Sequence, residues 1–217
     1  MNLDWGWLQN NTSDIAQMLG QHALLAVIPV LAALVIALPL GYLVHRTGTA
    51  ANAILAVLGV VYSIPSLALF VALPLVLGTS ILSQLNVVVA LTIYSVALLV
   101  RSVVDGLRSV PADVKQSASA VGFSRFGRLM KVELPLAMPV VFAGLRVVTV
   151  SNISLVTVAV LVASGGLGQL FLRAYNSIFY TPLIVGLVLT VLLALVADAI
   201  ILLVQRGTLP WTRRQRA

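Results

Sequence analysis

The stretch KQSASAVGFSRFGRLMKVELP, residues 115–135, is the longest polar segment in a chain that is otherwise almost wholly apolar. It has a run of small residues after Gln116, then Gly122, and it ends at Pro135. After Gly122, apolar side chains recur at helical spacing opposite basic ones, which is the pattern of a helix lying in a membrane interface. The apolar residues are Phe126, Leu129 and Met130, and the basic residues are Arg125, Arg128 and Lys131. We expect a partner to dock on the small-residue face.

The composition around this stretch indicates an integral membrane protein. Of the 217 residues, 60% are apolar and 9% are charged, and the mean hydropathy is +1.09, whereas soluble domains carry about 25% charged residues. No cysteine is present, which excludes disulfides and thiol chemistry. His22 and His45 lie at opposite ends of one apolar stretch, so no metal site and no catalytic residue is expected. The net charge of +7 is explained by loop placement rather than by nucleic-acid binding.

Five stretches are long enough to cross a bilayer as helices, which takes about 20 residues each. The sequence therefore predicts an all-α, polytopic membrane protein with about five transmembrane helices. Residues 1–22 contain no Lys or Arg, unlike the basic start of a cleaved signal peptide. The expected spans are Ala23–Val44, Ala51–Leu77, Leu85–Val104, Leu136–Ala163 and Leu183–Val204.

The basic residues give this arrangement an orientation. Eleven of the 13 fall on one side, after the first, third and fifth spans, while Arg173 lies on the other side and Arg146 inside a span. The positive-inside rule then places the N-terminus outside and the C-terminus in the cytoplasm. We expect an extracytoplasmic segment 1–22, a membrane domain 23–204 with a cytoplasmic loop 105–135, and a basic cytoplasmic tail 205–217.

Prolines interrupt several spans, and one of them suggests a break in the helix. In Ser63-Ile64-Pro65-Ser66, two hydroxyls flank a missing backbone donor near mid-span, which suits a break that lines a water-filled path. The other span prolines are read as ordinary kinks. The candidates for the translocation path are Ser63, Pro65, Ser66 and Asn152, and each hydroxyl or amide is equally well explained by a bond to a neighbouring helix.

Two charged residues fall inside spans, where an Arg or Asp costs about 2.5 to 3.5 kcal/mol near the bilayer centre. Arg146 lies about ten residues into the fourth span, and Asp198 about six residues from the end of the fifth. At 1.5 Å per residue both lie roughly 10 to 15 Å from the cytoplasmic face. We expect them to form an ion pair that holds the two spans together. The alternative is that each side chain reaches separately to the interface.

Glycines mark a turn after the fourth span, on the expected outer side. Gly165, Gly166 and Gly168 make a turn without side chains, which lets another backbone approach closely. It is no phosphate-binding loop, since no GK[ST] follows. A short interfacial helix, Leu170–Tyr175, is expected after it.

The 115–135 stretch resembles the cytoplasmic loop of bacterial ABC-importer permeases, whose pattern is E-A-A, three residues, G, nine residues, I-x-L-P. Here Gln116, Ser117 and Ala118 take the EAA places, followed at the same spacing by Gly122. Val132, Leu134 and Pro135 take the I-x-L-P places. The sequence departs from the pattern at Gln116, which replaces an acidic residue, and at Ser117, which replaces an alanine. The resemblance implies the transmembrane domain of a type I importer, with this loop coupled to an ATPase.

Further motifs resemble the permease subunits of osmoprotectant importers, the glycine betaine, carnitine and choline systems. They are Ile64-Pro65-Ser66-Leu67-Ala68-Leu69, Val132–Pro139, Ala143-Gly144-Leu145-Arg146 and Gly165-Gly166-Leu167-Gly168. The resemblance implies a dimer of permease subunits, a pair of cytoplasmic ATPase subunits that hold ATP and Mg²⁺, and an external substrate-binding protein. This chain itself would bind no cofactor, because it has no GxxxxGK[ST] motif.

Three other functions stay open at this point. The first is a type I permease for another small solute, such as methionine. The second is a secondary transporter, which is disfavoured because an odd span count and a lone Asp198 show no inverted repeat or proton relay. The third is an intramembrane enzyme, for which neither HExxH nor GxSxG is present.

Overall fold

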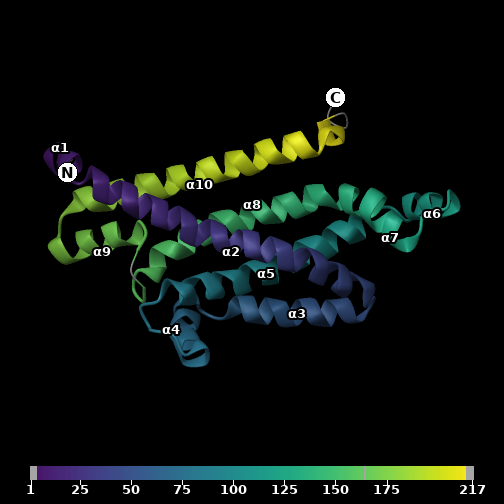
Figure 1. Cartoon of the computed structure of the whole chain (residues 1–217), viewed down its shortest axis with the longest axis horizontal. Coiled ribbons are helices and arrows are strands. Elements are labelled where there is room, and N and C mark those ends of the chain that lie inside the picture. Colours follow the sequence, from purple (N-terminus) through teal and green to yellow (C-terminus); the bar gives the residue numbers. More distant parts are fainter. Residues whose placement is uncertain (1–3, 164, 214–217) are drawn as a thin grey trace. The chain divides into compact units, whose positions relative to one another are not determined.

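The computed structural model describes residues 4–163 and 165–213, and the secondary structure of these residues is helical throughout (Figure 1). This confirms the predicted all-α class. The elements in chain order are α1 (Trp5–Asn10), α2 (Thr12–Arg46), α3 (Ala50–Ser63), α4 (Ser66–Leu77), α5 (Gln84–Ser109), α6 (Ala112–Ala120), α7 (Arg125–Arg128), the π-helical turn η1 (Leu129–Glu133), α8 (Leu134–Ala159), α9 (Gly168–Ser177), α10 (Tyr180–Thr208) and the 3₁₀ turn η2 (Pro210–Arg213).

Among the described residues, four helices are long and apolar enough to cross a membrane, and the α3–α4 pair makes a fifth span if it is counted as one. The prediction of about five spans is therefore confirmed. The break between α3 and α4 falls at Ile64 and Pro65, as the Ser63-Ile64-Pro65-Ser66 motif predicted. Pro29 and Pro39, by contrast, lie inside the uninterrupted α2, and Pro139 lies inside α8.

The first membrane helix begins earlier than the hydropathy suggested. Its helical residues start at Thr12, eleven positions before the expected Ala23. The reason is a packed extension, in which Ile15 and Met18 are buried against Leu167 and Leu170. Tertiary contacts of this kind stabilise helix beyond an apolar stretch, and a search for membrane spans does not detect them.

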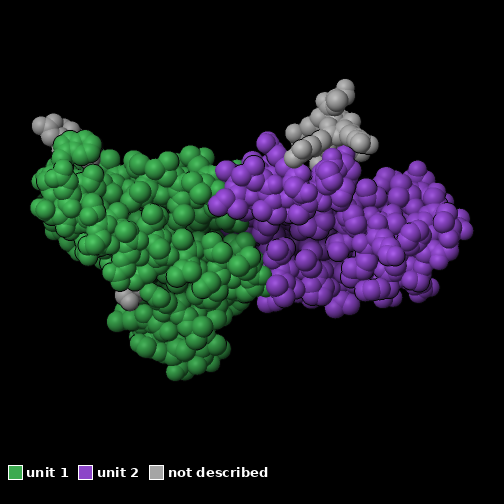
Figure 2. Space-filling model, turned by 45° about the horizontal axis from the view of Figure 1, so that its top comes forward, with its two compact units in different colours: residues 1–32, 64–93, 149–198 green, residues 33–63, 94–148, 199–217 purple. Residues whose placement is uncertain are grey.

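The described chain divides into two compact units, shown in different colours in Figure 2. Unit 1 comprises residues 1–32, 64–93 and 149–198, and unit 2 comprises residues 33–63, 94–148 and 199–217. Each of α2, α5, α8 and α10 contributes one part to each unit.

Unit 1 has a core of aliphatic side chains around Phe70, which is fully buried. The residues that pack there come from α2, α4, α5 and α8, and from the turn that follows α8. A second cluster joins the N-terminal part of α2 to α9. Unit 1 therefore packs α4 and the residues just before the glycine turn on one core, and Leu167 of that turn on the second cluster.

Unit 2 is built on α2, α5 and α8, which pack closely against one another. A Cβ at Gly106 would lie 2.9 Å from the Ala137 carbonyl oxygen, and one at Gly41 would lie 2.6 Å from Val103. Small residues that let helix backbones approach are typical of membrane helix contacts. Leu129 is buried in the same cluster as Val103, Leu107, Val110, Ala137 and Val141.

The segment before α8 differs from the expectation in one respect. It does not end at Pro135, because α7, η1 and α8 follow one another without a break. Pro135 lies inside this continuous helical segment, two residues after the end of the π-helical turn, so one backbone N–H is missing there. Leu129 faces the core of unit 2, while Phe126 and Met130 are 67% and 45% exposed.

Candidate functional site

The 115–135 stretch folds into a short helix, a glycine turn and the start of α8, all within unit 2. Helix α6 ends at Ala120, and Gly122 follows with φ of +93°. The Gly122 N–H donates to the Ser119 carbonyl and the Phe123 N–H donates to the Ala118 carbonyl, each at 3.1 Å. This is the Schellman arrangement, which places a residue with positive φ directly after a helix. The backbone therefore favours glycine here, because other residues adopt this φ only with strain.

The residues that match the EAA places divide between exposed and buried positions. Gln116 and Ser117 are exposed, and Ala118 is buried at 9% exposure against the rest of its own unit. Gly122 is also exposed, and a Cβ there would meet no atom within 4 Å. One side of α6 and its glycine turn therefore packs within the chain, and the opposite side is exposed and accessible to a partner.

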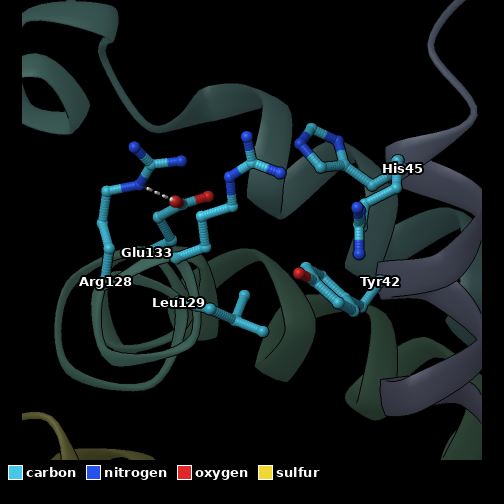
Figure 3. A pocket seen from close by; sticks show the side chains of 7 residues that line it. Tyr42, His45, Arg128, Leu129 and Glu133 are labelled. Atoms are coloured by element: carbon cyan, nitrogen blue, oxygen red, sulfur yellow. Dashed lines mark hydrogen bonds and ion pairs between the residues drawn. The ribbon is translucent and has the colours of Figure 1, made fainter. Parts of the chain in front are cut away.

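Arg128 links this helix to η1, and Figure 3 shows its bond to Glu133. Its Nε donates to Oε1 of Glu133 at 2.6 Å, and its Nη1 donates to Oγ of Ser119 at 2.6 Å. Glu133 is only 6% exposed, so its charge is stabilised chiefly by this arginine. Val132, Leu134 and Pro135, the other residues of the motif, are half-buried in the same region.

The sequence analysis did not identify this link. Ser119 lies in the run of small residues and Arg128 on the basic face, and neither position alone indicates the contact. The signal that was available is Glu133, the one acidic residue between Asp113 and Asp198. A lone carboxylate among basic residues at the start of a membrane helix predicts an ion pair, because such a group is costly to bury alone.

The residues predicted to line a translocation path lie in different environments. Ser63 ends α3, is exposed and donates its hydroxyl to the Val60 carbonyl at 2.7 Å. Pro65 is exposed and Ser66 is half-buried at the start of α4. Asn152 is buried in α8, at 1% exposure. The first three lie together at the break, and Asn152 lies on another helix.

Arg146 and Asp198 belong to different units, since Arg146 lies in the unit 2 part of α8 and Asp198 in the unit 1 part of α10. Both side chains are half-buried. Their pairing therefore stays a prediction.

The glycine turn after α8 is held by a histidine from α2, within unit 1. The Leu167 N–H donates to Nδ1 of His22 at 3.1 Å, so Nε2 carries the ring hydrogen and donates to the Ile153 carbonyl at 2.9 Å. Gly165 and Gly166 have φ of +120° and +77°, and a Cβ at Gly168 would overlap the Thr157 carbonyl oxygen. The expected close backbone approach is therefore present, and His22, which had no predicted role, fixes the turn to α2 and α8.

Comparison with known proteins assigns the chain to a family. Residues 30–209 match the family model of the binding-protein-dependent transport system inner membrane component. The chain is 32% identical over 210 residues to the glycine betaine/carnitine/choline transport system permease protein OpuCD of Bacillus subtilis, covering 96% of this chain and 90% of that protein. It is 33% identical over 195 residues to the osmoprotectant import permease protein OsmW of Salmonella typhimurium, covering 88% of this chain and 90% of that protein.

Solved structures show the same fold. An inward-facing structure of the MetNI methionine ABC transporter matches with a TM-score of 0.72 and 23% identity, over 96% of this chain and 99% of that one. A crystal structure of an amino acid ABC transporter with histidines matches with a TM-score of 0.73 and 16% identity, over 95% of this chain and all of that one. At these identities the likeness concerns the fold, which is that of a type I ABC-importer transmembrane domain. With the family model covering most of its length, the chain belongs to the binding-protein-dependent transport system inner membrane components.

Proposed function

We propose that this chain is the permease subunit of an ATP-driven importer for a small osmoprotectant such as glycine betaine, carnitine or choline. The support for this substrate class is the names of its relatives, which include a choline transport system permease, OpuBD of Bacillus subtilis, at 32% identity over 206 residues. The motifs Ile64–Leu69 and Gly165–Gly168 agree with that group. The methionine and amino acid transporters share only the fold, so they carry no argument for an amino acid substrate.

ATP hydrolysis would be supplied by a partner. The two lysines of the chain, Lys115 and Lys131, do not follow a glycine-rich loop, and no GxxxxGK[ST] sequence is present. A cytoplasmic pair of ATPase subunits would hold ATP and Mg²⁺, and this chain would bind neither. Residues 105–135 would then be the segment through which the ATPase acts.

The observation that carries this coupling role is the exposed helix α6 with its Gly122 cap. Gln116 and Ser117 are open to a partner, and Ala118 anchors the helix to unit 2. We infer that α6 and Gly122 lie in a groove of the ATPase. Closure of the ATPase pair would displace α6 and the helices joined to it, and so switch the permease between inward-open and outward-open states.

Two further partners follow from the same proposal. A second permease subunit, identical or different, would complete the path, with Ser63, Pro65, Ser66 and Asn152 as its candidate lining in this chain. An external binding protein would select the solute, because a quaternary ammonium is usually held in an aromatic cage, and the three tryptophans lie near the chain ends.

The test is uptake by the reconstituted importer. The chain is purified with the ATPase and binding protein that accompany it, placed in proteoliposomes and given labelled glycine betaine, choline, carnitine or methionine with ATP inside. We expect uptake of at least one of the three osmoprotectants. Unlabelled betaine or choline should suppress this uptake, and unlabelled methionine should not. Uptake of methionine alone would contradict the substrate assignment, and uptake independent of ATP would contradict the importer assignment.

A further inference from the structure

A basic cavity of about 260 Å³ opens between the C-terminal end of α2 and the segment that leads into α8, within unit 2 (Figure 3). One wall carries Tyr42 and His45, and the other carries the Arg128–Glu133 ion pair above Leu129. Arg46 and Arg125 complete the lining. Arg125, Arg128, Leu129 and Glu133 lie in the proposed coupling segment 105–135, but the cavity that they line has no part in the proposed docking of α6 and Gly122.

The cavity has more positive charge than its own carboxylate can balance. It is lined by three arginines and one glutamate, and the glutamate is committed to Arg128 at 2.6 Å. The Arg46 guanidinium lies 5.9 Å from the centre of the Tyr42 ring. Within the described chain, neither Arg46 nor Arg125 makes an ion pair, and both are exposed. Two guanidinium groups are thus left to bind an anion.

The donor groups are those that suit a phosphate. Guanidinium N–H groups match two oxygens of a tetrahedral oxyanion at once and form charge-assisted hydrogen bonds with it. Tyr42 and His45 lie in the same lining as the arginines. The volume is below that of a typical pocket for a drug-sized ligand and suits a small charged headgroup.

The surroundings of the cavity favour a lipid as the carrier of that phosphate. Leu43, Phe126 and Met130 are 58%, 67% and 45% exposed, and each is next in sequence to a residue of the lining. The helices that carry the lining are candidate membrane spans, Thr12–Arg46 and Arg125–Ala159. Basic residues at the ends of membrane helices attract anionic headgroups, and exposed apolar side chains beside them suit acyl chains.

We propose that Arg46 and Arg125, with Tyr42 and His45, bind the phosphate of an anionic phospholipid at this cavity. The ion pair of Arg128 with Glu133 forms its fixed wall. The proposal does not depend on which solute the protein transports.

The test compares the wild-type chain with the double variant Arg46→Gln/Arg125→Gln in its purified complex. Binding of phosphatidylglycerol is titrated in phosphatidylcholine nanodiscs, and co-purified phosphatidylglycerol is counted by native mass spectrometry. We expect the double variant to bind phosphatidylglycerol about tenfold more weakly or worse, since each basic group contributes substantially to headgroup attraction. The single variants Arg46→Gln and Arg125→Gln are each compared with Lys131→Gln, which also removes one charge from an exposed residue but does not line the cavity.

A loss in each single variant no greater than the loss in Lys131→Gln would overturn the proposal, since it would show attraction by general charge alone. No loss in the double variant would also overturn it. A second arm titrates inorganic phosphate and glycerol 3-phosphate against the protein in detergent. If both ligands bind the wild-type protein and not the double variant, the phosphate site is supported. If phosphatidylglycerol binds no more tightly than these two ligands, the site is one for a soluble anion, and the lipid proposal is overturned. Arg46→Lys/Arg125→Lys, which keeps the charge but not the two-point geometry, is expected to lose part of the affinity.

Discussion

Gly122 offers the most direct test of the coupling proposal. Its positive φ makes any side chain strained, and its exposure leaves room for that side chain to meet a partner. A side chain at this φ of +93° costs about 1 to 3 kcal/mol of local strain, but it would meet no atom of this chain. We predict that Gly122→Asp inserts into the membrane at a normal level while ATPase stimulation and uptake fall by about tenfold or more, equivalent to 1.4 kcal/mol or more. Membrane abundance, ATPase activity and uptake are measured on the same preparation.

Gly122→Asn separates the effect of side-chain bulk from that of charge. Asn is almost the same size as Asp but is uncharged, and it adopts positive φ more readily than most residues. If the ATPase groove rejects bulk, both variants lose coupling, and if it rejects charge, Asn retains most of it. Normal uptake and ATPase stimulation in Gly122→Asp would show that this turn does not lie in the groove.

Arg128 links two helical segments, since its side chain bonds Ser119 of α6 and Glu133 of η1. Arg128→Gln leaves the buried Glu133 without its cation, which costs about 1.5 to 3 kcal/mol for a hydrogen bond to a charged group. We predict a lower thermal unfolding temperature and weaker ATPase stimulation. Adding Glu133→Gln is expected to restore the unfolding temperature, because the uncompensated charge is gone, but not the stimulation.

The control for this link is Arg128→Lys, which keeps the charge and loses the fork that reaches Ser119 and Glu133 together. It is expected to keep stability and to lose part of the coupling. If the effects of Arg128→Gln and Glu133→Gln on unfolding simply add, the two side chains do not act as a pair and the link has no energetic role.

At this scale the sequence predicted what depends on local pattern. Apolar length identified the spans, Pro65 located a break, and Gly122 marked a turn, because each is a property of a few neighbouring residues. Contacts between distant residues were not predictable in the same way. The extension of α2 to Thr12 depends on burial against Leu167 and Leu170, and the role of His22 depends on Ile153 and Leu167, more than 130 residues away.

At the scale of the whole molecule, the proposed pair of Arg146 and Asp198 would hold the fourth and fifth spans together. Both side chains are half-buried on helices that qualify as membrane spans. We predict that Arg146→Ala and Asp198→Ala each lower the free energy of unfolding of the purified protein. The double variant is expected to lose less than the sum of the two single losses, by about 0.5 to 3 kcal/mol, which is the range for interacting residues. Additive losses would show that each side chain reaches the interface on its own.

The orientation of the whole chain is the broadest prediction, and the lack of cysteine makes it directly measurable. With the N-terminus outside, exposed Asn10 and Ser80 face the exterior and exposed Thr49 faces the cytoplasm. Single variants Asn10→Cys, Ser80→Cys and Thr49→Cys are treated with a membrane-impermeant maleimide on spheroplasts and on lysed membranes. We expect the first two to react in both samples and Thr49→Cys to react only after lysis. The reverse pattern would put α6 outside, where no ATP-driven partner could reach it, and would contradict the coupling mechanism together with the orientation.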